Sequence, residues 1–135
     1  MALVAKGLGH EVDYRKYLKR SGNRKNLWDA DFAAGGFKGF IRPRHRDGSW
    51  EQDFTALKTG TWGGDSFYEG NSWTYSLYVP QDVAGLIQKT GGNRNFVNRL
   101  DAFFDVPERY DVGNEPGFLA PYLYIWAGRH DKTAE

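Results

Sequence analysis

The sequence predicts an all-α fold in which helices are joined by loops, one of them long. Apolar residues recur at intervals of three and four along much of the chain, as they do on one face of a helix. No run of alternating apolar and polar residues, which is typical of a half-buried strand, is sustained. Clusters of glycine separate the helical stretches, so we expect an array of helical hairpins that carries its functional groups in loops.

Four helical segments are expected from this spacing. The first covers residues 12–27 and has basic residues that we interpret as a solvated face. The second covers 72–90 and contains Pro80, which lacks an N–H and marks a kink or a fresh helix start. The third is 93–104, and the fourth runs from 114 to 128. The inward face of this fourth helix is expected to carry Phe118, Leu119, Tyr122, Leu123 and Trp126.

A long connection, residues 29–64, separates the first two helices. Its glycines break any helix, and Asp47-Gly48 is a turn signal around which a short hairpin is expected. Long loops inside compact domains usually serve a site. We therefore assign to a binding surface the rings Phe37, Phe40, Trp50, Phe54 and Trp62. The basic patch 42–46 could meet acidic ligands, although exposed loop charge is the simpler interpretation.

Composition and charge exclude several classes of function. The 135 residues include 18 Lys and Arg against 17 Asp and Glu, a net charge of +1 that offers no strong field for nucleic acid. No apolar run is long enough to span a membrane, and no leader with a cleavage site is present. Cysteine is absent, which excludes disulfides, and the three histidines lack zinc-site spacing. We expect a soluble chain. The sequence does not fix its cellular compartment, and secretion of the parent protein is one option.

One glutamate stands where the glycine-rich connection gives way to the second helix. Glu69 lies in the stretch FYEGNSWTY, between aromatic residues and the first turn of that helix. As a structural feature, a carboxylate there gains from the helix dipole, and Asn71 or Ser72 can cap the helix. As a chemical feature, a carboxyl group among rings such as Tyr68 and Trp73 is partly desolvated, which favours the protonated form that a general acid needs. The residues alone support both interpretations equally.

A second candidate is the sequence Asn114-Glu115-Pro116. Asparagine is a common helix cap, and glutamate and proline are common in a first helical turn. An amide oxygen beside a carboxylate also supplies the hard oxygen ligands that calcium takes, with water or substrate hydroxyls completing the shell. Taken alone, the capping interpretation is the stronger one.

These two weak signals lie within a longer likeness. The stretches YEGNSWTYSLYVPQDVAGLI, FVNRLDAFF and GNEPGFLAPYLYIWAG closely resemble the catalytic domain of glycoside hydrolase family 92, the exo-acting α-mannosidases. The earlier stretches KRSGNRKNLWD, IRPR and DGSW look like the segment that precedes them in that family. The resemblance covers nearly the whole chain in the family's order, so we regard it as highly specific.

The resemblance implies a fold, an activity and a set of site residues. Residues 1–135 would be a fragment of one (α/α)6 catalytic barrel, truncated at both ends, in a family that joins the barrel to an N-terminal β-sandwich. Such enzymes hydrolyse α-mannosides with inversion and depend on calcium. Glu69 matches the family's general acid, and Asn114 and Glu115 match its calcium and substrate region. We assign to binding of the mannose-containing glycan the residues Tyr68, Asn71, Trp73 and Trp62.

Two departures from the family pattern stand out. The family's catalytic base is an aspartate in a later motif containing Gly-Gln-Met-Ser-Ala-Trp, and this chain ends before it. We therefore expect the chain alone to be inactive and to lack the remainder of its own domain. Members that resemble α-1,2-mannosidases carry His-Glu just before Asn-Glu-Pro, where this chain has Val112 and Gly113. A glycine there leaves room for a bulkier or charged leaving group, such as a mannosyl phosphate.

Two other functions fit parts of the pattern. A sugar-binding or structural helical module without catalysis would use the aromatic loop and keep Glu69 as a cap. Another (α/α)6 carbohydrate enzyme, such as a glucoamylase-like hydrolase, fits the helix pattern but not the Asn-Glu-Pro sequence, and it would need no calcium.

Overall fold

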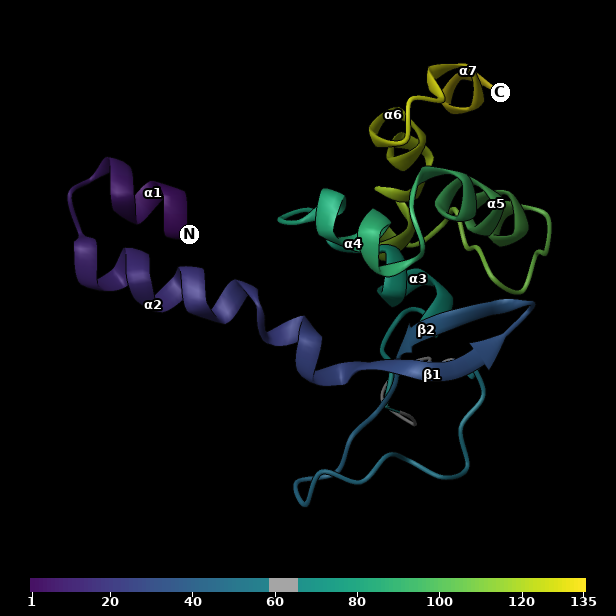
Figure 1. Ribbon diagram of the computed structural model, residues 1–135, viewed down its shortest axis with the longest axis horizontal. Helices are drawn as coiled ribbons and strands as arrows, with labels where there is room; N and C mark the ends of the chain where they lie inside the picture. Colours follow the sequence, from purple (N-terminus) through teal and green to yellow (C-terminus); the bar gives the residue numbers. More distant parts are fainter. Residues whose placement is uncertain (59–65) are drawn as a thin grey trace.

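The computed structural model describes residues 1–58 and 66–135 (Figure 1). Its α-helices are α1 (Ala2–Gly7), α2 (Glu11–Ser21), α3 (Ser72–Leu77), α4 (Val83–Lys89), α5 (Asn93–Phe104), α6 (Leu123–Trp126) and α7 (His130–Ala134). Short 3-10 helices lie at Asn23–Leu27, Glu115–Gly117 and Ala120–Tyr122. The strands β1 (Trp28–Ala34) and β2 (Phe37–Ile41) pair as an antiparallel sheet.

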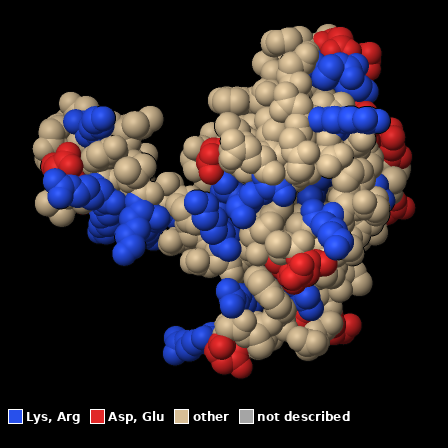
Figure 2. Space-filling view, in the orientation of Figure 1, with Lys and Arg blue, Asp and Glu red and all other residues tan. Residues whose placement is uncertain are grey.

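The helices α1 and α2 form an arm that extends from the body of the molecule (Figure 1). No residue of α2 is buried, and its lysines and arginines lie along the outside of the arm (Figure 2). The expected solvated face is therefore confirmed, although the α-helix ends at Ser21 and continues only as a 3-10 helix. No helix in residues 1–58 or 66–135 has both the length and the apolar character needed to cross a membrane.

The all-α expectation is wrong for residues 28–41, which form the hairpin of β1 and β2. Gly35 and Gly36 make its turn with φ of 56° and 86°, and positive φ at both positions is a feature of one common two-residue hairpin turn that glycine suits. The pairing register shifts between Asp29 and Ala33, so buried and exposed positions do not alternate regularly along β1. That shift explains why the sequence shows no alternating strand pattern in this region. The Gly-Gly pair is the one sequence signal here, and it marks the turn.

Helix α3 is held against β2 by two serine hydroxyls that lie one helical turn apart. The hydroxyl of Ser72 donates to the carbonyl oxygen of Ile41 at 2.5 Å, and the N–H of Ile41 donates to Oγ of Ser76 at 2.8 Å. Both serines are fully buried, and residues four apart share one helix face. The two bonds satisfy the backbone of Ile41 at the end of the strand and fix the position of α3.

The hydrophobic core lies between the hairpin and the helices that follow it. Helix α5 has the predicted bounds, and Phe96, Leu100 and Phe103 on its predicted stripe are fully buried. Phe40 of β2, which the sequence assigned to a binding surface, is also fully buried. Its ring packs edge-on against Trp73 of α3, with the ring centres 5.0 Å apart. Phe40 therefore packs in the hydrophobic core and does not form part of a binding surface.

A buried arginine joins α5 to the hairpin. Arg99 is 1 % exposed, and its Nη1 donates to the carbonyl oxygens of Gly39 at 2.8 Å and Lys38 at 3.2 Å. Its guanidinium lies 4.0 Å from the centre of the Phe40 ring. No described carboxylate pairs with it, and burial lowers the pKa of Arg99 to about 9. Carbonyl oxygens and ring faces therefore hold this cation in place of an ion pair.

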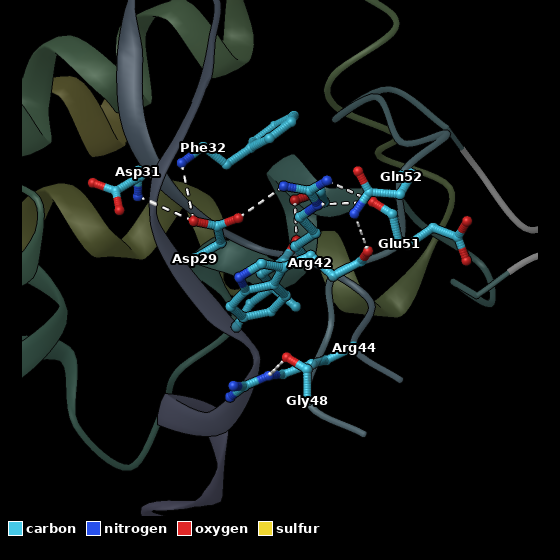
Figure 3. Close-up of polar contacts among 11 residues, drawn as sticks. Asp29, Asp31, Phe32, Arg42, Arg44, Gly48, Glu51 and Gln52 are labelled. Atoms are coloured by element: carbon cyan, nitrogen blue, oxygen red, sulfur yellow. Dashed lines mark hydrogen bonds and ion pairs between the residues drawn. The ribbon is translucent and has the colours of Figure 1, made fainter. Parts of the chain in front are cut away.

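The loop that follows β2 is anchored by Arg42 (Figure 3). Its Nη1 pairs with Oδ2 of Asp29 at 2.9 Å, and its Nη2 donates to the carbonyl oxygen of Glu51 at 2.5 Å. The guanidinium also lies over the rings of Phe32 and Phe54, 5.3 and 5.7 Å from their centres. Arg42 is therefore part of the fold, and the interpretation of exposed loop charge is wrong for this residue.

Two other expectations about loops and helices are corrected. The short hairpin expected around Asp47-Gly48 is reduced to one bridge, which pairs Arg44 with Trp50. The single helix expected over 114–128 is broken into 3-10 helices and α6, because prolines near the start of each 3-10 helix interrupt a continuous hydrogen-bond ladder. The broken path leaves exposed three residues that were expected to face inward: Phe118, Tyr122 and Trp126.

We predict that Gly35→Ala destabilises the protein more than Gly36→Ala. Both changes place alanine at positive φ, which costs about 1–2 kcal/mol. A Cβ at position 35 would also lie 2.6 Å from Nη2 of Arg109 and 2.8 Å from Cζ2 of Trp73, whereas a Cβ at position 36 meets open space. Thermal unfolding of the two variants measures the difference, and equal losses would show that the turn does not press on these two side chains.

Candidate functional site

A pocket of about 540 Å³ lies where the start of α3 faces the chain that follows α5. We call it the Glu69 pocket. Its lining residues are Glu69, Gly70, Asn71, Thr74, Pro107, Glu108, Tyr110, Asp111, Val112, Asn114 and Gly117. The fold thus brings together the two motifs that the sequence singled out, although they lie far apart in the chain.

Glu69 lines this pocket in a backbone conformation that is unusual for glutamate. Its φ is 55°, and no other non-glycine residue of the described chain has a positive φ. Glu69 is partly buried, and it also lines a second hollow of about 480 Å³ together with Tyr75, Tyr78, Glu115 and Pro116. Glu69 therefore stands between two concave surfaces.

Two side chains hold the backbone on either side of Glu69. The hydroxyl of Tyr75 donates to the carbonyl oxygen of Tyr68 at 2.6 Å. Nδ2 of Asn114 donates to the carbonyl oxygen of Glu69 at 3.0 Å. The ring of Tyr75 lies close to Gly70, where a Cβ would be 3.1 Å from its Cε2 atom. The backbone at Glu69 is thus bonded to both α3 and the Asn-Glu-Pro segment.

Asn71 caps α3 and also holds the opposite wall of the pocket. Its Oδ1 accepts from the N–H of Thr74 at 3.1 Å, which confirms the capping interpretation. Its Nδ2 donates to the carbonyl oxygens of Glu108 at 3.0 Å and Arg109 at 3.4 Å. Asn71 lines the pocket, but its amide is bonded to the protein, and its assignment to substrate binding stays a prediction.

The other residues assigned to glycan binding have different positions. Tyr68 is 49 % exposed beside Glu69. Trp73 is 1 % exposed and does not line the pocket, because its ring lies in the core beneath the guanidinium of Arg109, 4.3 Å from the ring centre. The sequence assignment of Trp73 to a sugar-contacting role therefore has no support from its position. Trp62 lies outside the described residues.

The described lining of the Glu69 pocket is acidic. Glu69, Glu108 and Asp111 contribute carboxylates, and no described Lys or Arg lines it. Nearby phenols respond to these charges. Burial, followed by the charge of Glu69, raises the pKa of Tyr75, and burial, followed by the charge of Asp111, raises the pKa of Tyr110. Both phenols remain protonated donors at neutral pH, since their pKa is moved further above it.

The residues proposed as calcium ligands lie on both sides of Glu69. Asn114 lines the Glu69 pocket, whereas Glu115 is exposed and lines the second hollow. Within residues 1–58 and 66–135, no group of three or more His, Asp or Glu side chains is arranged to hold a metal ion. The described chain therefore offers oxygen donors of the right kind for calcium, but too few to make a complete site.

Sequence reasoning missed the wall formed by the chain after α5. Residues 106–113 lie between the third and fourth expected helices, and no site residue was assigned to them, yet Glu108, Tyr110 and Asp111 line the Glu69 pocket. The hydrogen bonds from Asn71 to this segment cross 37 and 38 positions of sequence, and such a pairing has no local pattern. The sequence signal that could have indicated this wall was its position in the chain, because the segment directly precedes the Asn-Glu-Pro motif.

We predict that Asn71→Asp keeps α3 capped but loosens the pocket wall. Aspartate still accepts from the N–H of Thr74, but it lacks the Nδ2 donor and sets a charge against the carbonyl oxygens of Glu108 and Arg109. Loss of a hydrogen bond costs about 0.5–1.5 kcal/mol, so amide hydrogen exchange in residues 105–112 should become faster. Asn71→Ala, which also removes the cap, should melt at a lower temperature still. Unchanged hydrogen exchange in Asn71→Asp would contradict the conclusion that Asn71 holds this wall of the pocket.

The chain matches known proteins over its whole length. Residues 1–135 match the glycosyl hydrolase family 92 catalytic domain. A protein of Arthroderma benhamiae that bears the name uncharacterized secreted glycosidase is 39 % identical over 148 residues, which cover 100 % of this chain and 19 % of that protein.

Two solved structures share the fold of this chain, and both are of a family GH92 α-mannosidase from Bacteroides thetaiotaomicron. The structure in complex with mannoimidazole has a TM-score of 0.84 and 31 % identity, and covers 98 % of this chain and 19 % of that chain. The other has a TM-score of 0.80 and 35 % identity, and covers 98 % and 17 %. The chain thus spans about a fifth of the length of its relatives. It belongs to glycosyl hydrolase family 92.

Proposed function

We propose that this chain carries the general acid of an inverting, exo-acting α-mannosidase that removes terminal mannose from glycans. The position of Glu69 carries the proposal, because this partly buried carboxylate lines a pocket at the start of a capped helix. Membership in family 92 and the likeness to an α-mannosidase support mannose as the sugar. Glu69 would protonate the leaving oxygen as its bond to mannose breaks.

The reaction also needs a carboxylate base, which we assign to a motif outside this chain. Inverting hydrolases place the base roughly 6.5–9.5 Å from the acid, with space for a water molecule. The family resemblance implies a later aspartate for this role. Residues 1–135 would then form part of one (α/α)6 barrel that the remainder of the catalytic domain completes, and they would be inactive alone.

Calcium is the cofactor that we propose, held in part by Asn114 and Glu115. These residues offer an amide oxygen and a carboxylate, which are the hard donors that calcium takes. The hydrogen bond from Nδ2 of Asn114 to Glu69 leaves the amide oxygen available for such a contact. Because calcium takes six to eight oxygen ligands, the others would come from water, substrate and further parts of the protein. When bound, it would hold sugar hydroxyls and favour the distorted ring of the transition state.

The acidic lining of the pocket favours a neutral leaving group. A phosphate would approach the carboxylates of Glu69, Glu108 and Asp111 with no lining Lys or Arg among the described residues to balance them. Like charges that are brought close together disfavour binding. Although Gly113 provides space for a larger group, we therefore favour a neutral mannoside over a mannosyl phosphate.

The proposed substrate also bears on where the protein acts. A relative that shares 39 % identity has a name that describes a secreted glycosidase. We propose the same location for the protein that carries this chain, where mannose-containing glycans are accessible. Its partner would be this glycan and not nucleic acid, because the net charge is only +1.

We predict that Glu69→Gln in the full-length protein lowers the turnover of a mannoside with a poor leaving group by about 10²–10⁴-fold. Glutamine keeps the shape of the side chain but cannot donate the required proton. A calcium chelator should also abolish activity, and added calcium should restore it. The measurement is the release of mannose with and without the chelator.

Glu108→Gln is the matched control for this experiment, because Glu108 is another carboxylate of the same pocket. It should lose much less activity than Glu69→Gln. Survival of full activity in Glu69→Gln would show that Glu69 is not the general acid. If the wild-type protein binds mannosides but cleaves none, the function is that of a carbohydrate-binding module.

We predict that α-1,2-mannobiose is cleaved with a higher kcat/KM than a mannosyl-phosphate substrate. The reason is the repulsion between a phosphate and the acidic lining of the pocket. Raising the ionic strength should narrow the difference, since salt screens such repulsion. Preference for the phosphate substrate would instead indicate that residues outside this chain supply a compensating cation.

A further inference from the structure

The conformation of Glu69 decides where its carboxylate points. Its φ of 55° is in the left-handed region, which residues other than glycine rarely adopt. The backbone angles at a residue set the direction in which Cβ leaves the main chain, so a return to an ordinary conformation would turn the carboxylate away from its present position. Such a conformation persists only when the surroundings enforce it.

Two hydrogen bonds supply that enforcement. The peptide group before the Cα atom of Glu69 includes the carbonyl of Tyr68, which accepts from the hydroxyl of Tyr75 at 2.6 Å. The peptide group after this Cα atom includes the carbonyl of Glu69 itself, which accepts from Nδ2 of Asn114 at 3.0 Å. The angles φ and ψ of Glu69 describe how these two peptide groups are rotated relative to each other. Bonds that orient both groups therefore fix both angles.

Tyr75 is well placed to act in this way. It lies on α3, which the buried serines attach to β2, so the helix gives the ring a fixed base. The ring packs against Phe67, with the ring centres 5.7 Å apart, and against Gly70, which has no Cβ to obstruct it. Burial and the charge of Glu69 keep the phenol protonated, so it remains a donor.

We propose that Tyr75 is a positioning residue, which with Asn114 holds Glu69 in the left-handed conformation that aims its carboxylate at the leaving oxygen. This inference rests on the proposed role of Glu69 as the general acid. Tyr75 itself need not contact the substrate. Its contribution should therefore appear only when the reaction needs the proton from Glu69.

The test compares two substrates of the full-length protein. A dinitrophenyl α-mannoside has a leaving group that departs without protonation, whereas methyl α-mannoside or α-1,2-mannobiose needs the acid. In Tyr75→Phe, which keeps the ring but lacks the donor, we expect kcat/KM to fall roughly tenfold or more on the poor leaving group, because a small misplacement of a catalytic group is costly. On the dinitrophenyl substrate the loss should stay below about twofold.

A matched control comes from Tyr78, which lines the same second hollow. Its backbone N–H donates to Thr74, but its hydroxyl makes no hydrogen bond to a backbone carbonyl of the described residues. Tyr78→Phe should change both substrates equally and slightly. Equal losses on both substrates in Tyr75→Phe would assign it a general structural role and overturn the inference, as would no loss on either.

Glu69→Gln separates this inference from the proposed function. If Glu69→Gln loses activity selectively on the poor leaving group while Tyr75→Phe does not, the acid assignment stands and the positioning role is wrong. If Glu69→Gln shows no such selectivity, the acid assignment itself is wrong, and the positioning role that depends on it is wrong as well.

Discussion

The geometry of the candidate site depends on the attachment of α3 to β2. Ser72 and Ser76 bond the carbonyl and the N–H of Ile41, so one strand residue fixes one face of the helix. Asn71 caps the start of that helix, and Tyr75 lies in its first turn. A rotation of α3 would break the serine bonds and, at the same time, displace Tyr75, whose hydroxyl holds the carbonyl of Tyr68 beside Glu69. The hairpin, although it does not line the pocket, is therefore the base on which the pocket is built.

A second contact connects the hairpin to the opposite wall of the pocket. The turn glycine Gly35 lies directly on Trp73 and on the guanidinium of Arg109. Arg109 stacks on the Trp73 ring and donates to the carbonyl oxygen of Ala102 at 2.6 Å, near the end of α5. The segment after α5 is thereby held between the hairpin turn and the capping side chain of Asn71. Both walls of the Glu69 pocket are positioned by the same small sheet.

The sequence predicted the parts of this arrangement that depend on local pattern. Helix α5 and its buried stripe follow directly from the 3.6-residue period. The position of Glu69 at the start of a helix capped by Asn71 was also readable, since capping is a short-range property. The hairpin was missed because its register shift removes the alternation that identifies a strand.

There is a simple geometric reason why Trp73 does not face the pocket as the sequence assignment implied. Trp73 and Tyr75 are both close to Glu69 in sequence, but residues two apart lie about 200° apart around a helix. One of them must then face away when the other faces the acid. The structure buries Trp73 in the core and leaves Tyr75 beside Glu69. Nearness in sequence identified the aromatic surroundings of the glutamate, but only the orientation of α3 against β2 decides which ring belongs to them.

The backbone at Glu69 departs from the local conformational preference. Glycine suits a positive φ, and Gly70 stands next in the chain, yet the glutamate adopts that conformation. A structural turn could have used glycine at this position and avoided the strain. A residue that keeps a carboxylate there, together with two side chains that hold the flanking peptide groups, indicates that the placement of the carboxylate outweighs its conformational cost. The same reasoning explains why a helix cap alone is an insufficient account of Glu69, because Asn71 already performs the capping.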